Sequence, residues 1–129
     1  VAELVGRFEN ERRSLPAISL VTNISSITAI SNDYSFDDIF SRQVESLGNK
    51  GDIFFALSTS GHSKNIINAL KIAKKKSLLT IGLTGIKKGI MNSYCDYLIE
   101  IPSHNTARIQ EGHILIGHIL CGIIEKNFS

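Results

Sequence analysis

The stretch GDIFFALSTSGHSKNIINALKIAKKKSLLTIGLTG, residues 51–85, decides the fold class. It starts with one apolar run, 51–59, and ends with another, 77–85, and hydroxyl or glycine residues close both runs. Runs of this length suit buried strands better than helices. Between them, residues 63–76 repeat apolar side chains at helical steps. Strand, helix and strand in this order are typical of a parallel sheet that helices cover on both faces.

The same alternation continues outward along the chain. Two further apolar runs, 15–22 and 96–102, predict two more strands. Helical patterns occupy residues 25–33 and 35–48, and the longest one occupies residues 105–127. The sequence therefore predicts a single three-layer α/β/α domain over all 129 residues.

Composition and charge exclude several classes of protein. A content of 43% hydrophobic and 20% charged residues is that of a globular domain, without a bias toward disorder. The net charge of +2 is too small to indicate a nucleic-acid partner. The densest basic run, 71–76, falls at the expected end of a helix, where cations complement the helix dipole.

The cysteines and the chain ends bear on location. Cys95 and Cys121 stand far apart without C-x-x-C spacing, which indicates neither a zinc knuckle nor a redox pair and favours a reduced, cytoplasmic protein. The most apolar segment, 114–124, is too short for a bilayer that needs about 20 residues, so no membrane span is predicted. The chain opens without an initiator Met or a signal peptide and reads as the middle of a helix.

The last predicted helix is apolar on nearly every side in its second half. Such a helix has to be buried by more than one neighbour. Its three glycines, Gly112, Gly117 and Gly122, would each cost about 1 kcal/mol relative to alanine, which predicts that another backbone comes close. We expect this helix to lie in a subunit interface.

The loop at residues 58–63 follows a predicted strand and precedes a predicted helix. Ligands of open α/β sheets bind beyond the carboxyl ends of the strands, and a helix N-terminus attracts an anion. Gly61 allows close approach of a ligand. The hydroxyl donors are Ser58, Thr59, Ser60 and Ser63. Hydrogen bonds to a charged group contribute roughly 1.5–3 kcal/mol each, so these donors could hold a small phosphate compound. A helix cap in a polar turn is the alternative. Neither nucleotide-binding glycine motif is present.

Acid and base candidates gather on the last helix, with Glu3 near the start of the chain. The seven-residue step from Glu111 to His118 returns to nearly the same helix face, whereas Gln110 lies about 80° away. Spacing therefore favours Glu111 as the companion of His118. His118 sits in the most apolar part of the chain, where an imidazole is either structural or functional. His113 is a further candidate on the same helix. Asp33 and Asp37 could equally be helix or turn caps, and His62 and His104 are interpreted as exposed loop residues.

Five segments together carry a family resemblance: ELVGRF (3–8), ISNDYSFDDIFSRQVE (30–45), STSGHSKN (58–65), GLTG (82–85) and TARIQEGHILIGHILCGIIE (106–125). In this order and spacing they resemble the sugar isomerase (SIS) family, and within it the sedoheptulose 7-phosphate isomerases, over essentially the whole chain. The resemblance implies a mostly parallel, doubly wound, Rossmann-like sheet. It also implies a homotetramer with the long helix in the interface and with active sites shared between subunits.

The reaction implied by the resemblance converts sedoheptulose 7-phosphate to D-glycero-D-manno-heptose 7-phosphate through an enediol, for bacterial lipopolysaccharide and ADP-heptose. The matching positions are Glu3 and His118 for acid and base, Ser58, Thr59, Ser60 and Ser63 for phosphate, Asn32 and Asp33 for sugar, Arg7 near the site, and Gln110 with Glu3 and His118 for a zinc ion. The resemblance thus selects Gln110 where spacing favours Glu111.

Two departures from the family pattern accompany the resemblance. His62 stands where members more often have asparagine, and the family's first helix, first strand and a zinc-binding histidine four residues before Glu3 have no counterpart here. A rival reading is a non-catalytic SIS module that binds a phosphosugar or the DnaA replication protein. Such modules tend to lack a histidine at the position of His118. A second rival is an isomerase of another sugar phosphate.

Overall fold

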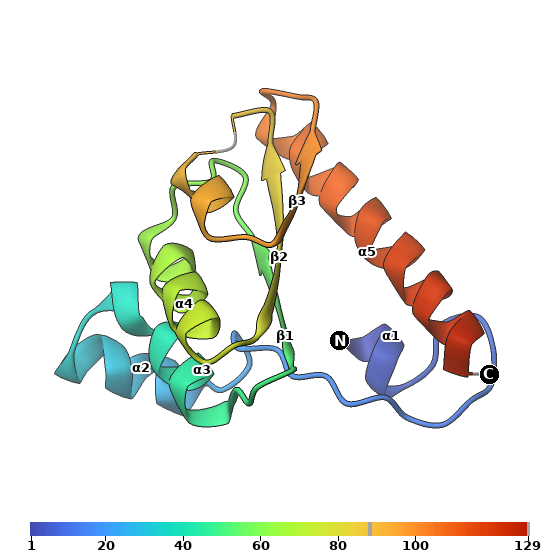
Figure 1. Ribbon diagram of the computed structural model, residues 1–129, viewed down its shortest axis with the longest axis horizontal. Coiled ribbons are helices and arrows are strands. Elements are labelled where there is room, and N and C mark those ends of the chain that lie inside the picture. Colours follow the sequence, from blue (N-terminus) through green and yellow to red (C-terminus); the bar gives the residue numbers. More distant parts are fainter. Residues whose placement is uncertain (88, 129) are drawn as a thin grey trace.

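The computed structural model describes residues 1–87 and 89–128. The elements along the chain are α1 (Ala2–Val5), α2 (Ile24–Asp33), η1 (Phe36–Asp38), α3 (Ser41–Leu47), β1 (Ile53–Leu57), α4 (Lys64–Lys75), β2 (Leu79–Gly85), η2 (Ile90–Ser93), β3 (Tyr97–Ile101) and α5 (Thr106–Phe128). The strands form one parallel sheet in the order β1-β2-β3. Helices α2, α3 and α4 lie on one side of this sheet and α5 on the other (Figure 1). The predicted α/β/α layering is confirmed.

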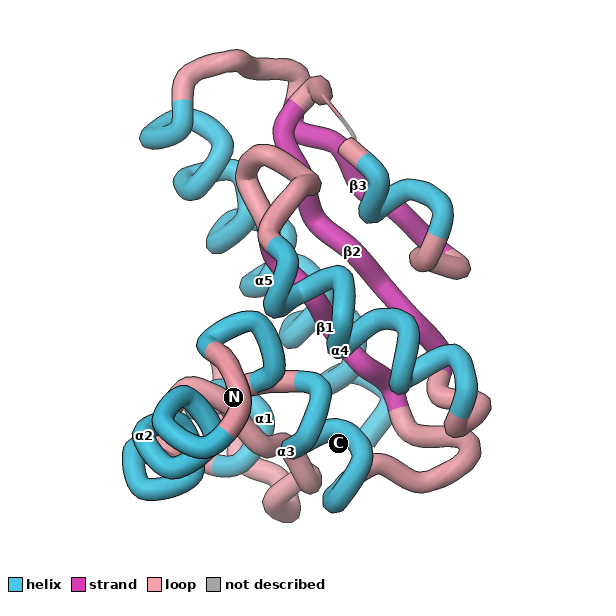
Figure 2. The backbone as a smooth tube through the Cα atoms, turned by 90° about the vertical axis from the view of Figure 1, so that its left-hand side faces the viewer, coloured by secondary structure: helices cyan, strands magenta, loops and turns pink. Residues whose placement is uncertain are grey.

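The β1-α4-β2 unit forms because short apolar runs give its two strands, and apolar residues at helical spacing give α4 a face that packs on the sheet. In α4, Ala69, Leu70 and Ala73 are fully buried against the sheet. On the sheet, Ala56 of β1 packs with Leu70 of α4, and its partner Gly82 of β2 leaves room for the Met91 and Cys95 side chains. Figure 2, which faces this side of the molecule, shows α4 lying across the strands. This packing fixes the loop between β1 and α4 at the carboxyl end of the sheet.

The strand predicted at residues 15–22 was wrong, because this segment has no regular secondary structure. Leu15 is buried, but Ile18 and Val21 are 68% and 62% exposed. Gln43 of α3 donates its side-chain N–H to the Leu20 carbonyl at 3.0 Å, so a helix rather than a strand meets this backbone. A short apolar run becomes a strand only where a sheet edge pairs with it.

The long helix predicted at residues 105–127 is confirmed as α5. It packs on β2 and β3 near its start and on α1 near its end. The expected close approach of another backbone is absent among the described residues: a Cβ at Gly112 would lie 2.7 Å from the Ile101 side chain, one at Gly122 would meet the Phe8 ring at 3.6 Å, and one at Gly117 would meet nothing within 4 Å. Several of its large apolar side chains are about half exposed or more, among them Ile114, Leu115, Ile119 and Ile123. Within the described ranges, no helix combines the length and apolar character needed to cross a membrane.

Candidate functional site

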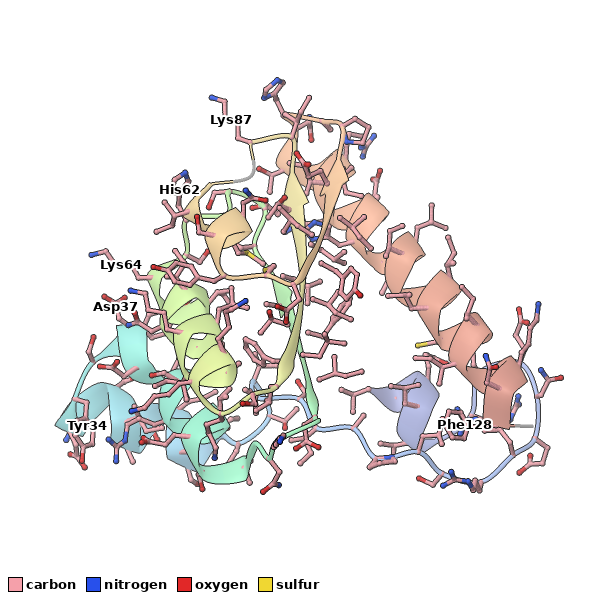
Figure 3. All side chains as sticks on the ribbon, in the orientation of Figure 1. Tyr34, Asp37, His62, Lys64, Lys87 and Phe128 are labelled. Carbon is pink, nitrogen blue, oxygen red and sulfur yellow. The ribbon has the colours of Figure 1, made fainter. Side chains whose placement is uncertain are left out.

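A cavity of about 330 Å³ opens where the three strands end. Each strand contributes the loop that follows it, and α5 contributes its first turn. The lining residues are Thr59, Ser60, His62, Gly85, Ile86, Lys87, Ser103, His104, Thr106 and Ile109. Figure 3 shows the labelled His62 and Lys87 at this end of the molecule. The cavity therefore lies where open α/β sheets bind ligands, as the sequence predicts.

The lining of the cavity favours an anion. Four residues with hydroxyl side chains, two histidines and Lys87 line it, and no Asp or Glu is among the described residues that line it. Helices α4 and α5 both begin at this edge, so the positive ends of two helix dipoles face the same region. Hydroxyl and N–H donors with one cation match the needs of a phosphate group.

The hydroxyl loop divides its side chains between two tasks. Ser58 is buried, and its Oγ lies 2.8 Å from Ser63 Oγ and accepts the Gly61 N–H at 3.1 Å. Ser63 is the N-cap residue of α4, yet its side chain makes no capping hydrogen bond. The cap alternative therefore does not account for this hydroxyl. Thr59 and Ser60 line the cavity, so two of the four predicted phosphate ligands reach it while the other two brace the loop.

Neighbouring segments hold the loop in place. Gly61 has a positive φ of 68°, and its carbonyl accepts the Met91 N–H at 3.2 Å. The Thr59 carbonyl accepts the Gly85 N–H at 3.0 Å, which ties the loop to the end of β2. Gly89 also has a positive φ, 58°, and a Cβ there would lie 2.3 Å from the Gly61 carbonyl oxygen. The segment before η2 thus packs directly against the backbone of the loop.

The predicted acid and base lie on two elements in contact. Helix α1 carries the half-buried Glu3 and packs on α5, which carries the exposed His118. The His118 ring stacks on Phe8, with ring centroids 5.5 Å apart. The structure therefore places the helices that bear Glu3 and His118 side by side (Figure 1).

The predicted zinc ligands do not fit one ion within a single chain. Gln110 precedes His118 by eight positions on the same helix, a rise of about 12 Å, whereas zinc ligands lie about 2 Å from the metal. In the part of the chain that the structure describes, no group of three or more His, Cys, Asp or Glu side chains could hold a metal. We therefore derive no chemical step through zinc.

The predicted sugar-facing residues lie apart from the acid and base. Asn32 and Asp33 end α2, on the α4 side of the sheet and at the opposite side of the molecule from α1 (Figure 1). Both are exposed, and Asn32 donates to the Asp33 carboxylate at 2.9 Å. Arg7 is also exposed, in the segment that follows α1. A single chain thus distributes the predicted site over the cavity, the α1-α5 contact and the end of α2.

Two further helix candidates take structural positions. His113 is buried, and its Nε2 lies 3.2 Å from the Thr84 carbonyl, which joins α5 to β2. Glu111 is exposed and pairs with Arg108 one turn earlier. Neither side chain reaches the α1-α5 contact through a described interaction.

Sequence reasoning missed residues that matter for the site. Lys87, Ser103 and Thr106 line the cavity; the signal of the first two was their position just after predicted strands, and that of Thr106 was its position at the start of the predicted helix. His104 was read as an exposed loop residue; it is exposed, but it lines the cavity too. Glu125, near the end of α5, is 1% exposed and binds the segment that follows α1. No residue spacing in the sequence predicts that contact.

Comparison with known proteins places this fold in a family. The family model for the SIS domain matches residues 1–85. A phosphoheptose isomerase of a Nitratiruptor species is 54% identical over 127 residues, which cover 98% of this chain and 68% of that protein. The chain belongs to the phosphoheptose isomerase group of the SIS family.

Other members of the SIS family agree with this assignment. The phosphoheptose isomerase of Sulfurimonas denitrificans is 55% identical over 97% of this chain and 64% of its own length. The solved phosphoheptose isomerase of Francisella tularensis has a TM-score of 0.93 at 42% identity, covering 97% of this chain and 67% of that one. That of Neisseria gonorrhoeae has a TM-score of 0.90 at 42% identity, with 97% and 66% covered. The chain spans about two thirds of the length of these relatives.

Proposed function

We propose that the chain is an aldose-ketose isomerase that converts sedoheptulose 7-phosphate to D-glycero-D-manno-heptose 7-phosphate. The observation that carries the proposal is the anion-favouring cavity at the carboxyl edge of an SIS sheet, in a chain about half identical to phosphoheptose isomerases. The resemblance seen in the sequence points to the same reaction. Lipopolysaccharide heptose as the end product and the cytoplasm as the location are further parts of the proposal, and the two free cysteines are consistent with a reducing compartment.

The proposed mechanism begins with the phosphate. Thr59 and Ser60 hydroxyls and the Lys87 ammonium bind it in the cavity, while the mutual bond of Ser58 and Ser63 keeps the loop shaped for it. Since these groups already have their positions, little ordering is needed when the anion arrives. The phosphate anchor leaves the carbonyl end of the sugar to the acid and base.

Proton transfer is assigned to Glu3 and His118. One of them removes a proton from the carbon beside the carbonyl and the other protonates the carbonyl oxygen, which gives an enediol. Protonation of the former carbonyl carbon, with loss of the proton from the hydroxyl of the neighbouring carbon, then yields the aldehyde. A positioned carboxylate or imidazole typically contributes 10²- to 10⁴-fold to such a step. The contact between α1 and α5 supports this pairing because the helices that bear the two groups pack against each other.

We further propose that complete sites form between copies of this chain, in a homotetramer. Two observations support this: the predicted site is distributed over distant parts of one chain, and α5 exposes an apolar stripe of Leu115, Ile119 and Ile123. A contiguous exposed apolar face is a common mark of an interface. A zinc ion held by Glu3, Gln110 and His118 would also require two copies, because Gln110 and His118 are too far apart on one helix.

The proposal is tested by incubating the full-length protein with ketose phosphates of five, six and seven carbons and measuring each aldose product. We expect turnover with sedoheptulose 7-phosphate and at least tenfold less with the shorter sugars. Preference for a shorter ketose would favour the rival isomerase. Tight phosphosugar binding without turnover of any sugar would favour the non-catalytic SIS module.

A further inference from the structure

A buried ion pair, Arg12 with Glu125, joins the segment that follows α1 to the end of α5. Arg12 Nε lies 3.4 Å from Glu125 Oε1, and both side chains are 1% exposed. We call these two residues the Arg12–Glu125 clamp. Arg12 Nε has no hydrogen-bond partner among the described residues, so the other guanidinium nitrogens and the Glu125 carboxylate make the hydrogen bonds that a buried ion pair requires.

Glu125 binds the chain segment that carries Phe8. Its carboxylate accepts the backbone N–H groups of Phe8, Glu9 and Asn10 at 3.0, 2.9 and 2.9 Å, and the Asn10 side chain at 3.2 Å. Three successive N–H groups directed at one carboxylate form an anion-binding backbone nest. Burial opposes the charge, but the N–H groups of Asn10, Phe8 and Glu9 outweigh it and lower the pKa of Glu125 to about 2.

Arg12 binds the helix that carries Glu3. Its guanidinium donates to the carbonyls of Leu4 and Gly6 at 2.9 and 3.0 Å, and also to the Glu3 carbonyl. These carbonyls belong to the end of α1, where a helix leaves its last acceptors unpaired. These bonds therefore fix the C-terminal end of α1 relative to Arg12.

Both arms of the clamp lead to the proposed acid and base. Arg12 holds the backbone of Glu3, and Glu125 holds the backbone of Phe8, whose ring stacks on His118. Glu125 follows His118 by seven positions, so both lie on nearly the same face of α5. We propose that Arg12 and Glu125 are positioning residues for the isomerisation, which set Glu3 and His118 relative to each other without touching the substrate. This inference rests on the proposed function.

Loss of the Arg12–Glu125 clamp should affect kcat and KM differently. The phosphate cavity lies at the carboxyl edge of the sheet and includes no residue of the clamp. Loss of the clamp should therefore lower kcat and leave the KM for sedoheptulose 7-phosphate nearly unchanged. Misplacement of a catalytic group by about 1 Å can cost about 100-fold in rate.

The test compares Glu125→Gln with Asp96→Asn in the full-length protein. Asp96 is a matched control because its carboxylate is also held by N–H donors, from Thr80 and Lys74, with a pKa of about 2, and it lies away from α1. We expect Glu125→Gln to lower kcat by about 10- to 100-fold with KM within about threefold, and Asp96→Asn to change kcat less than about threefold. Arg12→Lys keeps the positive charge but lacks the guanidinium group that binds several carbonyls, so this variant should also lower kcat. If Glu125→Gln does not fold, Arg12→Lys takes its place in the test.

The second readout is the NMR signal of the His118 ring, whose protons are shifted by the stacked Phe8. In Glu125→Gln this shift should move toward that of a free histidine, and in Asp96→Asn it should not. An unchanged His118 signal, or a kcat no lower than that of Asp96→Asn, overturns the positioning role. If the wild-type protein isomerises no ketose phosphate, the proposed function fails, and the His118 signal then decides by itself whether the clamp sets the His118 environment.

Discussion

Replacement of Gly89 by alanine should damage the phosphate loop from outside the cavity. Gly89 has φ 58° and ψ −164°, a conformation open essentially to glycine, so a side chain costs about 1–3 kcal/mol in backbone strain. The new Cβ would also lie 2.3 Å from the Gly61 carbonyl oxygen, where ordinary contact begins at 3.4 Å, so one backbone must move by about 1 Å. Such overpacking costs about 1–3 kcal/mol more.

The displacement should weaken phosphate binding as well as stability. Loss of one hydrogen bond to a charged group, about 1.5–3 kcal/mol, lowers affinity by roughly tenfold to a hundredfold. The assays are urea unfolding and calorimetric titration with sedoheptulose 7-phosphate. Gly51→Ala is the control, because Gly51 also has a positive φ, 91°, but a Cβ there meets nothing within 4 Å. It should cost about 1–2 kcal/mol of stability and no affinity. Wild-type affinity in Gly89→Ala would refute the link between this segment and the loop.

Three further predictions follow from single features. The pKa of Glu125 is lowered from an ordinary 4.5 to about 2, so its carboxylate stabilises the fold fully above pH 4.5 and loses this contribution as the pH falls toward 2. The protection of the amides of residues 8–10 against hydrogen exchange should therefore decrease over that range, and pH-independent protection would contradict the prediction. Among the described residues, Thr84 Oγ1 is buried with no hydrogen-bond partner, so Thr84→Val should leave the free energy of unfolding unchanged or raise it by about 1 kcal/mol. A loss above about 2 kcal/mol in urea would contradict this. Ile119→Glu on the exposed face of α5 should dissociate the oligomer in sedimentation, with Ile18→Glu on the α1-α2 connection as control; a monomeric wild type at micromolar concentration would contradict the interface.

The fold could be predicted where the sequence pattern and the burial coincide. Residues 51–85 are such a case, because Ala56, Leu70 and Leu83 are buried in the layers that their spacing implies. Residues 15–22 show the limit: the run is apolar and of strand length, but whether it pairs depends on which backbone lies beside it. That information is tertiary, and the local sequence does not contain it.

The site could be predicted in the same uneven way. The loop at residues 58–63 was visible because hydroxyl residues follow a buried strand, and the cavity is indeed located there. Lys87 and His104 come from other loops and meet it only through the sheet order. Glu125 was hidden for a different reason, since its partners are backbone N–H groups more than a hundred positions away, and backbone groups carry no sequence signature.

The central claim is that Glu3 and His118 move protons on a ketose phosphate that the cavity holds by its phosphate. The most direct measurement is NMR of sedoheptulose 7-phosphate incubated in D₂O with the full-length protein, Glu3→Gln or His118→Gln. We expect the wild type to form the aldose with deuterium on the carbon beside the aldehyde. Both variants should form none while still binding the sugar phosphate in a titration. Aldose formation by either variant at a rate near that of the wild type would contradict the account.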